Sequence, residues 1–357
     1  MEGALVMMIS VSEKYSHVTG VDTHAAQHVF TVIESTTGKV VDTASFPTTP
    51  AGLKRSVSWT IRHSPTRPLV VIEGIGSYGA QLAAVMARAG LDVVEPDPIP
   101  AVVKRGRGKN DQMDSRRIAA SVLATPVDHL RYPRADAGIR DALGVLATAR
   151  DTMNQERTRA INQLTALVRV HGLGVDARTA LTRDQYWDIA HWRTHDEPLA
   201  DAVARSEATR LATRVLDLAD DLADNKTHIH HIIQASPYAI LLDEKGIGPI
   251  SAAAIIIAWG THGRIHSEAA FAALAGVNPI PVSSGNTSRH RLNRGGDRHL
   301  NRALTVIIDS RMAHHEPTRR YAADHLAKGR TQRDIKRSLK RYLARHLYKI
   351  LNTIIVD

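Results

Sequence analysis

The period of the apolar residues changes near residue 135, and this change constrains the fold more than any other feature of the chain. Before it, short apolar runs alternate with helical patterns. Residues 17–47 predict an antiparallel meander with a turn at residues 36–39, while "RPLVVIEGIG" and "LDVVEPD" predict further strands separated by a helix. Strands that alternate with helices after a meander predict an α/β domain with a mixed sheet.

After residue 135 the pattern is helical and strand signals largely disappear. Two long amphipathic segments cover roughly Ile139–Val170 and Leu199–Gln234. Apolar residues of the second segment recur at steps of three and four, at Leu211, Val215, Leu218, Leu222, Ile229 and Ile232. This stripe is consistent with an antiparallel helical hairpin, with an intermolecular coiled coil, or with core packing alone. The chain therefore divides into three predicted domains, at residues 1–135, 136–237 and 238–357.

The third predicted domain opens with "LLDEKGIGPISAAAIIIAWG", in which Gly246 and Gly248 stand between two short helical patterns. This arrangement is typical of a helix-hairpin-helix element, whose glycine turn can present backbone N–H groups to a phosphate. A glycine turn that merely joins two packed helices is the alternative. The basic sequence downstream favours phosphate binding.

The positive charge of the chain is concentrated near its C-terminal end. The net charge of the chain is +10. Residues 284–351 alone carry 17 Arg and Lys against five acids, so the positive charge of this region exceeds that of the whole chain. Clustered cations bind phosphates irrespective of sequence, and we therefore expect a nucleic-acid partner. No apolar stretch is long enough for a membrane span, and "MEGALVMMISVSEKYSH" lacks the features of a secretory signal. The absence of cysteine fits a cytoplasmic protein.

Four carboxylates occupy places from which they can converge. Asp22 lies inside a predicted strand, Glu73 follows the strand "LVVI", and Asp111 and Asp114 occur in "KNDQMDSRRIAA", where a helix begins. A spacing of three places the last two on one helix face. Mg²⁺ takes oxygen ligands, and a pair of such ions can stabilise the attacking and leaving oxygens of a phosphodiester cleavage. Each acid alone has an ordinary explanation as a turn, cap or first-turn residue.

These residues carry a family resemblance. "GVDTH", "VVIEG" and "KNDQMDSRRIA" look like the RuvC-like, RNase H-fold domain of the DEDD transposases of bacterial insertion sequences, the IS one-ten type. "GIGPISAAAIIIAWG" and "FAALAGVNPIPVSSGNTSRHRLNRGGDRHLNRAL" resemble that family's C-terminal transposase domain. The resemblance covers nearly the whole chain, with the middle helical segment as its least specific part. It implies an α/β RNase H-like domain, a helical coiled-coil or oligomerisation segment, and a basic α-helical transposase domain.

The resemblance also implies roles for individual residues. Asp22, Glu73, Asp111 and Asp114 are the expected ligands of Mg²⁺ or Mn²⁺. Ser284, directly before Gly285, matches the family's essential serine, with Ser283 as the competing register; it is the expected nucleophile on the scissile phosphodiester. The remaining expected contacts to nucleic acid are Gly246, Gly248, Arg289, Arg291, Arg294 and Arg298.

The implied partners are double-stranded donor and target DNA, a structured guide RNA that pairs with both, and further copies of the chain as a dimer or tetramer. The implied location is the bacterial cytoplasm, in association with the nucleoid. Only 4% of the residues are aromatic, which argues against recognition by base stacking and fits a protein that grips backbones.

Two alternative functions stay open at this stage. One is a junction-resolving nuclease in which water is the nucleophile and Ser284 is structural. The other is a non-catalytic nucleic-acid-binding protein in which the acids are structural. The histidines of "THIHHII" and "MAHHEP" lack a further ligand set, so we expect no zinc site there.

Overall fold

A computed structural model describes residues 9–64, 66, 68–96, 111–133, 138–193, 196–260, 264–284, 287–293 and 295–354. The chain forms two compact units, Met1–Ala135 and Asp136–Asp357. Each unit is described by itself. The further division of the second unit at residue 237 stays a prediction.

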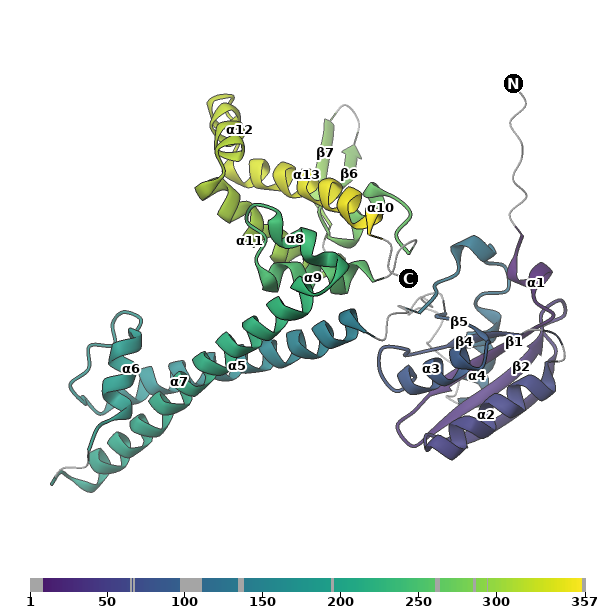
Figure 1. The fold of residues 1–357 in the computed structure, drawn as a ribbon, viewed down its shortest axis with the longest axis horizontal. Helices are drawn as coiled ribbons and strands as arrows, with labels where there is room; N and C mark the ends of the chain where they lie inside the picture. The colour runs from purple at the N-terminus through teal and green to yellow at the C-terminus, as the bar shows by residue number, and fades with distance from the viewer. Residues whose placement is uncertain are drawn as a thin grey trace. The chain divides into compact units, whose positions relative to one another are not determined.

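The first unit is an α/β domain built on a five-stranded sheet (Figure 1). Its strands are β1 (His17–Thr23), β2 (Gln27–Glu34), β3 (Val40–Pro47), β4 (Leu69–Ile72) and β5 (Asp92–Val94). Its helices are α1 (Val11–Lys14), α2 (Pro50–His63), α3 (Ala80–Arg88) and α4 (Asp111–Ala120). The meander, the two later strands and the helices between them were all predicted from the apolar pattern.

The sheet is mixed, with strand order β3-β2-β1-β4-β5. β1, β2 and β3 pair antiparallel, whereas β4 runs parallel to both β1 and β5. This arrangement is consistent with the RNase H-like fold. Because β1 is central, a side chain at its end lies beside the end of its parallel neighbour β4.

The two faces of the sheet pack against different helices. On one face, Val21, Phe30, Val70 and Ile72 form a core with residues of α2 and α3. The opposite face carries Val18, Ile33, Leu69 and Val71, which pack with Ile118 and Ala119 of α4. The alternation of these residues along each strand follows the period of two that a sheet covered on both faces requires.

The second unit begins with a long helical arm (Figure 1). It contains α5 (Ile139–Val170), α6 (Arg183–Ala190) and α7 (Leu199–Gln234). Hydrogen bonds fix α5 and α7 as antiparallel partners: Arg150 Nη1 donates to the Leu222 carbonyl at 2.7 Å, and Asn225 Nδ2 donates to the Leu146 carbonyl at 3.0 Å. The apolar stripe of α7 is buried within the chain itself. Of the alternatives that the stripe left open, the structure therefore shows the antiparallel hairpin.

Short and medium helices complete the second unit around a single large core. They are α8 (Ile240–Asp243), α9 (Pro249–Trp259), α10 (Glu268–Leu274), α11 (Arg298–His314), α12 (Glu316–Ala327) and α13 (Gln332–Thr353). The apolar helix α9 is central, and Trp259 packs edge-on against Phe271 of α10 and Tyr348 of α13. The same core includes Ile229 and Ile233 at the end of α7, so the arm and the terminal helices are continuous.

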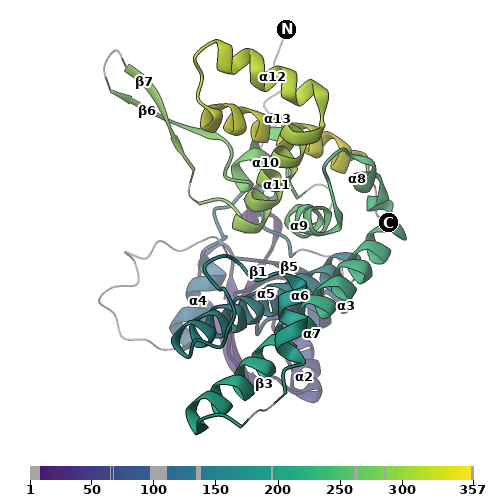
Figure 2. The same ribbon diagram turned by 90° about the vertical axis from the view of Figure 1, so that its left-hand side faces the viewer.

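A two-stranded ribbon interrupts this helical region. β6 (Pro279–Ser284) and β7 (Thr287–Leu292) pair antiparallel and project from the helices in Figure 2. The predicted α-helical C-terminal domain is therefore largely helical, and this ribbon is an element that the sequence analysis did not predict. The alternation in "TSRHRL" is typical of a strand, but the prolines of "NPIPV" and the sequence Ser-Gly-Asn are typical of a loop.

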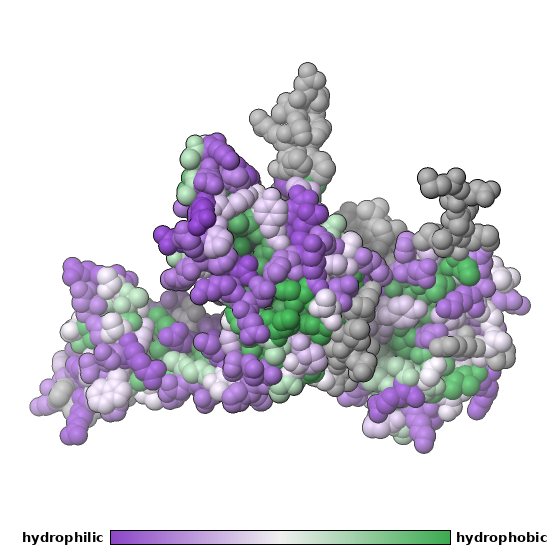
Figure 3. Space-filling model, turned by 45° about the horizontal axis from the view of Figure 1, so that its top comes forward, coloured by the Kyte–Doolittle hydropathy of each residue, from purple (hydrophilic) through white to green (hydrophobic). Residues whose placement is uncertain are grey.

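Among the described residues, no helix is long and apolar enough to cross a membrane. On the face drawn in Figure 3, hydrophilic residues predominate over the arm formed by α5, α6 and α7.

Candidate metal centre

The strand β1 places Asp22 on the face of the sheet that α4 covers. Val18 lies on this face in contact with the α4 core, and Gly20 and Asp22 follow it at steps of two. The Asp22 side chain is only 14% exposed. A carboxylate in this position is held by a central strand rather than by a loop.

Glu73 reaches the same edge of the sheet from the neighbouring strand. Val21 of β1 is paired with Ile72 of β4, so the next residues along the two strands are Asp22 and Glu73. The Glu73 amide donates to the Val21 carbonyl at 3.1 Å, and Thr23 Oγ1 donates to the Glu73 carbonyl at 2.8 Å. These bonds tie the backbone of Glu73 to the end of β1.

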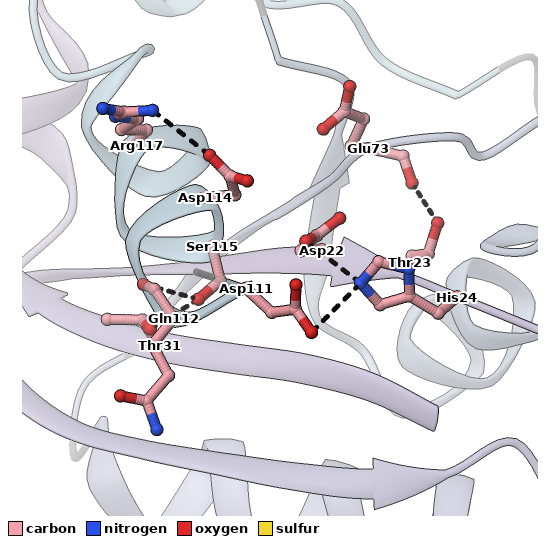
Figure 4. Close-up of polar contacts among 10 residues, drawn as sticks. All are labelled: Asp22, Thr23, His24, Thr31, Glu73, Asp111, Gln112, Asp114, Ser115 and Arg117. Atoms are coloured by element: carbon pink, nitrogen blue, oxygen red, sulfur yellow. Dashed lines mark hydrogen bonds and ion pairs between the residues drawn. The ribbon is translucent and has the colours of Figure 1, made fainter. Parts of the chain in front are cut away.

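The helix α4 brings the other two acids against β1. Its backbone approaches so closely that a Cβ atom on Gly20 would lie 2.1 Å from the Ser115 carbonyl oxygen. The hydroxyls of Ser115 and Thr31 share a buried hydrogen bond of 2.7 Å, which fixes the helix against β2. Asp111 and Asp114 therefore face the sheet edge that carries Asp22, and Figure 4 shows the carboxylates gathered there.

The structure adds one residue to the predicted cluster. His24 Nε2 lies 3.2 Å from Asp22 Oδ2 and 3.7 Å from Asp111 Oδ2 (Figure 4). One ligand atom from each of these three residues falls within 4.8 Å of the others. Sequence reasoning missed His24, although it stands two residues after Asp22 in "DTH" and the period of a strand places both on one side.

The electrostatics of the cluster oppose four ionised carboxylates. Burial raises the pKa of Asp22, the charge of His24 counteracts this, and the carboxylates of Glu73, Asp114 and Asp111 raise it further. Outside the cluster, Arg117 Nη1 donates to Asp114 Oδ1 at 3.3 Å and partly compensates that one acid. A bound cation would offset the remaining repulsion.

The residues present fit a divalent metal ion. Carboxylate oxygens come from a strand, the end of a second strand and a helix, so they are held by rigid elements. The Nε2 atom of His24 is shielded from solvent and lies between the carboxylates of Asp22 and Asp111, so it can add a nitrogen ligand to their oxygens. Asp22, His24 and Asp111 are the closest group, with Glu73 and Asp114 beside them.

The predicted residues of the second unit stand apart from this cluster along the chain. Ser283 and Ser284 are the last residues of β6, and Arg291 is an exposed residue of β7. Arg298 is exposed at the start of α11. Arg294 and the side chains of Ser283, Ser284 and Arg289 lie outside the described residues.

The glycine turn between α8 and α9 is present as predicted. Gly246 has a φ of +82°, and Gly248 directly precedes α9. A Cβ atom on Gly246 would lie 3.2 Å from the Ile307 carbonyl oxygen of α11. Arg311 of α11 donates to the Lys245 carbonyl at 2.6 Å and pairs with Glu244 at 2.9 Å. This close packing explains Gly246 without a ligand, and phosphate binding by the turn stays a prediction.

Comparison with known proteins places this geometry in a family. The model of a DEDD transposase domain of the IS110 type matches residues 19–171, which include all four acids. A second model, the transposase IS116/IS110/IS902 family, matches residues 238–323, which include β6 and β7. The chain belongs to the IS110 family of transposases. These enzymes carry out DNA transposition, and DEDD transposases generally use divalent metals.

Curated relatives agree with this membership. A putative transposase, y4rJ, of Sinorhizobium fredii is 26% identical over 281 residues, which cover 71% of this transposase and 68% of the relative. An uncharacterized 43.6 kDa protein of the insertion element IS110 in Streptomyces coelicolor is 24% identical over 314 residues, which cover 74% and 76% of the two chains. The recognition drawn from the sequence motifs is thus confirmed.

Proposed function

We propose that this IS110-family transposase cleaves and rejoins DNA with two sets of residues, the acids of the first unit and a serine of the second. The observation that carries the proposal is the convergence of Asp22, Glu73, Asp111 and Asp114 at one sheet edge, with His24 among them. The pairing of β1 with β4 and the packing of α4 on Gly20 support these residues as the metal ligands.

The acids and His24 share one task in this proposal, which is to hold the metal ion. Asp22, His24 and Asp111 hold Mg²⁺ or Mn²⁺, and Glu73 and Asp114 complete the ligand set. The ion, when bound, supplies positive charge to the phosphoryl oxygens and to the attacking and leaving oxygens. Thr23 and Ser115 are positioning residues, because their hydrogen bonds hold the backbone of Glu73 and the helix α4 in place.

Ser284 is the proposed nucleophile. Its Oγ attacks the scissile phosphorus, the bond from phosphorus to the sugar oxygen breaks, and the serine proton leaves through a carboxylate of the cluster to the departing oxygen. Attack by a hydroxyl of the second DNA strand on the phosphoserine then forms the new phosphodiester and restores the serine hydroxyl. One phosphate ester bond forms and one breaks at each step, so no external energy source is required. Ser283 is the alternative register.

The locations of the acids and the serine bear on the partners of the chain. The acids and the serine belong to different units, so we propose that the working site assembles within a dimer or tetramer of the chain. We further propose that a structured RNA selects donor and target DNA. The basic C-terminal region and the scarcity of aromatic residues support a protein that grips nucleic-acid backbones and leaves sequence recognition to base pairing.

The metal ligands are tested by direct Mn²⁺ binding, measured by electron paramagnetic resonance, together with cleavage of DNA from the element's ends. Asp22→Asn, Asp111→Asn and Asp114→Asn are expected to weaken Mn²⁺ binding by about tenfold or more and to abolish cleavage. Asp128→Asn removes an exposed carboxylate of the same unit and serves as the control. Wild-type affinity in the three cluster variants would refute the metal centre.

A further inference from the structure

A small cavity between α11 and α13 is lined by four basic residues and two uncharged ones. Its volume is about 200 Å³, and its walls are formed by Thr305, Ile308, Arg333, Lys336, Arg337 and Lys340. The four basic residues follow one another at steps of three, one and three, so they share one face of α13. None of the described lining residues is a carboxylate, although Asp309 lies close enough to pair with Lys336. None of these residues was predicted as a contact from the sequence.

Only part of this charge is compensated within the described part of the chain. Lys336 pairs with Asp309 at 2.7 Å, and Arg337 pairs with Asp334 at 3.2 Å. Arg333 has no ion-pair partner among the described residues, and the Lys340 Nζ atom donates only to neutral groups, Asn301 Oδ1 at 3.2 Å and Thr305 Oγ1 at 3.4 Å. Arg333 and Lys340 are therefore available to bind an anion.

Lys340 is held in a position that penalises its charge. Burial lowers the pKa of its ammonium group; Arg337 lowers it further, Asp309 opposes this, and Lys336 adds to the lowering. A half-buried cation beside two others is costly unless an anion joins it. Asn301 and Thr305 orient the ammonium group but carry no charge to balance it.

We propose that the cavity between α11 and α13 binds a backbone phosphate of a nucleic acid through Arg333 and Lys340. Its volume is below the roughly 300–1,000 Å³ of pockets for drug-sized ligands, which suits a small group such as a phosphate. An Arg fork and a Lys point charge are the usual phosphate ligands. The inference rests on the proposed function, because it assumes that the second unit grips nucleic acid, and it names a place where it does so.

The test measures binding in EDTA, so that catalysis plays no part. Fluorescence anisotropy follows a labelled DNA duplex and, separately, a labelled RNA hairpin over a series of salt concentrations. Arg333→Gln/Lys340→Gln is compared with Arg319→Gln/Arg320→Gln, which removes the same charge from exposed positions of α12. Thermal unfolding checks that each variant is folded, and Arg333→Gln alone, at an exposed position, serves if the double variant is unstable.

The cavity variant is expected to bind DNA or RNA about tenfold to a hundredfold more weakly, with the slope of log K against log salt reduced by about 1, and the α12 variant less than about threefold more weakly. Arg333→Gln alone is expected to weaken binding about threefold to tenfold. If the cavity variant binds only one of the two probes more weakly, that probe identifies the cavity's ligand as DNA or as RNA. Equal losses in the two double variants, or no loss in the cavity variants, would overturn the inference while leaving the proposed function intact. Failure of the wild type to bind either nucleic acid would instead refute both.

Discussion

Gly20 of β1 and Ser115 of α4 approach so closely that the strand has no room for a side chain at this point. A Cβ atom at Gly20 would lie 2.1 Å from the Ser115 carbonyl oxygen and 2.4 Å from the Ala119 amide nitrogen. Both are backbone atoms and cannot turn aside. This contact is what brings the acids of α4 to Asp22.

We expect Gly20→Ala to destabilise the first unit by about 1–3 kcal/mol, because α4 must move away from the sheet. The same movement withdraws Asp111 and Asp114 from Asp22, so Mn²⁺ affinity is also expected to fall. Denaturant unfolding and Mn²⁺ titration measure the two effects. Gly144→Ala is the control, since nothing lies within 4 Å of a Cβ at that helical position, and it is expected to be neutral or slightly stabilising. Equal stability of the two variants would contradict the close approach.

Asp22→Asn is expected to raise the melting temperature of the metal-free protein at neutral pH. The pKa of Asp22 is raised in the folded state, so its contribution to stability is present at low pH and is lost as pH rises through that pKa. The amide removes this cost. Mg²⁺ should then stabilise the wild type more than the variant. Melting curves in EDTA and in Mg²⁺ measure both effects; a variant less stable than the wild type in EDTA would count against the electrostatic account.

Because His28 of β2 is buried, we expect the free energy of unfolding to fall in mild acid. Its side chain is 1% exposed, and burial, assisted by the charge of His24, lowers its pKa below the usual value of 6.5. The unfolded chain therefore takes up a proton first as pH falls, and stability declines below about pH 6.5, by up to about 1.4 kcal/mol per pH unit. His28→Gln should flatten this decline, whereas His129→Gln, at an exposed position, should leave it unchanged. Unfolding curves at several pH values measure the stability of each protein. The same dependence of stability on pH in the wild type and both variants would contradict the prediction.

Substitution of His24 should change which metal ion the site prefers. An imidazole nitrogen is a better ligand for Co²⁺ than for Mg²⁺, which takes oxygen ligands. We expect His24→Asn to weaken Co²⁺ binding about tenfold and Mg²⁺ binding much less, as measured by calorimetric titration. His17→Asn is the control, because His17 begins β1 whereas His24 directly follows the other end of that strand. Equal losses for both ions would show that His24 is not a ligand.

Long helices could be predicted from the sequence alone, because their apolar patterns extend over many turns. The bounds predicted for the two amphipathic segments, Ile139–Val170 and Leu199–Gln234, are those of α5 and α7, because an apolar stripe over many turns leaves little freedom. The acids could be found because Asp22 interrupts an apolar strand and Asp111 and Asp114 share a helix face. Neither signal required knowledge of tertiary contacts.

Other features depend on contacts that the sequence does not record. The ribbon of β6 and β7 was not predicted, because prolines and the sequence Ser-Gly-Asn are typical of a loop. The cavity is lined by residues as far apart in the sequence as Thr305 and Lys340. It exists only because α11 packs on α13, and the sequence does not record that packing. The close approach at Gly20 is likewise visible only once α4 is placed on the sheet.

The measurement that tests the central claim most directly is a denaturing-gel assay for a covalent protein–DNA adduct. It uses labelled DNA from the element's ends, its candidate RNA and Mg²⁺, with wild type, Ser284→Ala, Ser283→Ala and Asp114→Ala. The account predicts an adduct in the wild type and in Ser283→Ala, and none in Ser284→Ala or Asp114→Ala. Metal-dependent cleavage without an adduct, with full activity in both serine variants, would contradict it and identify water as the nucleophile.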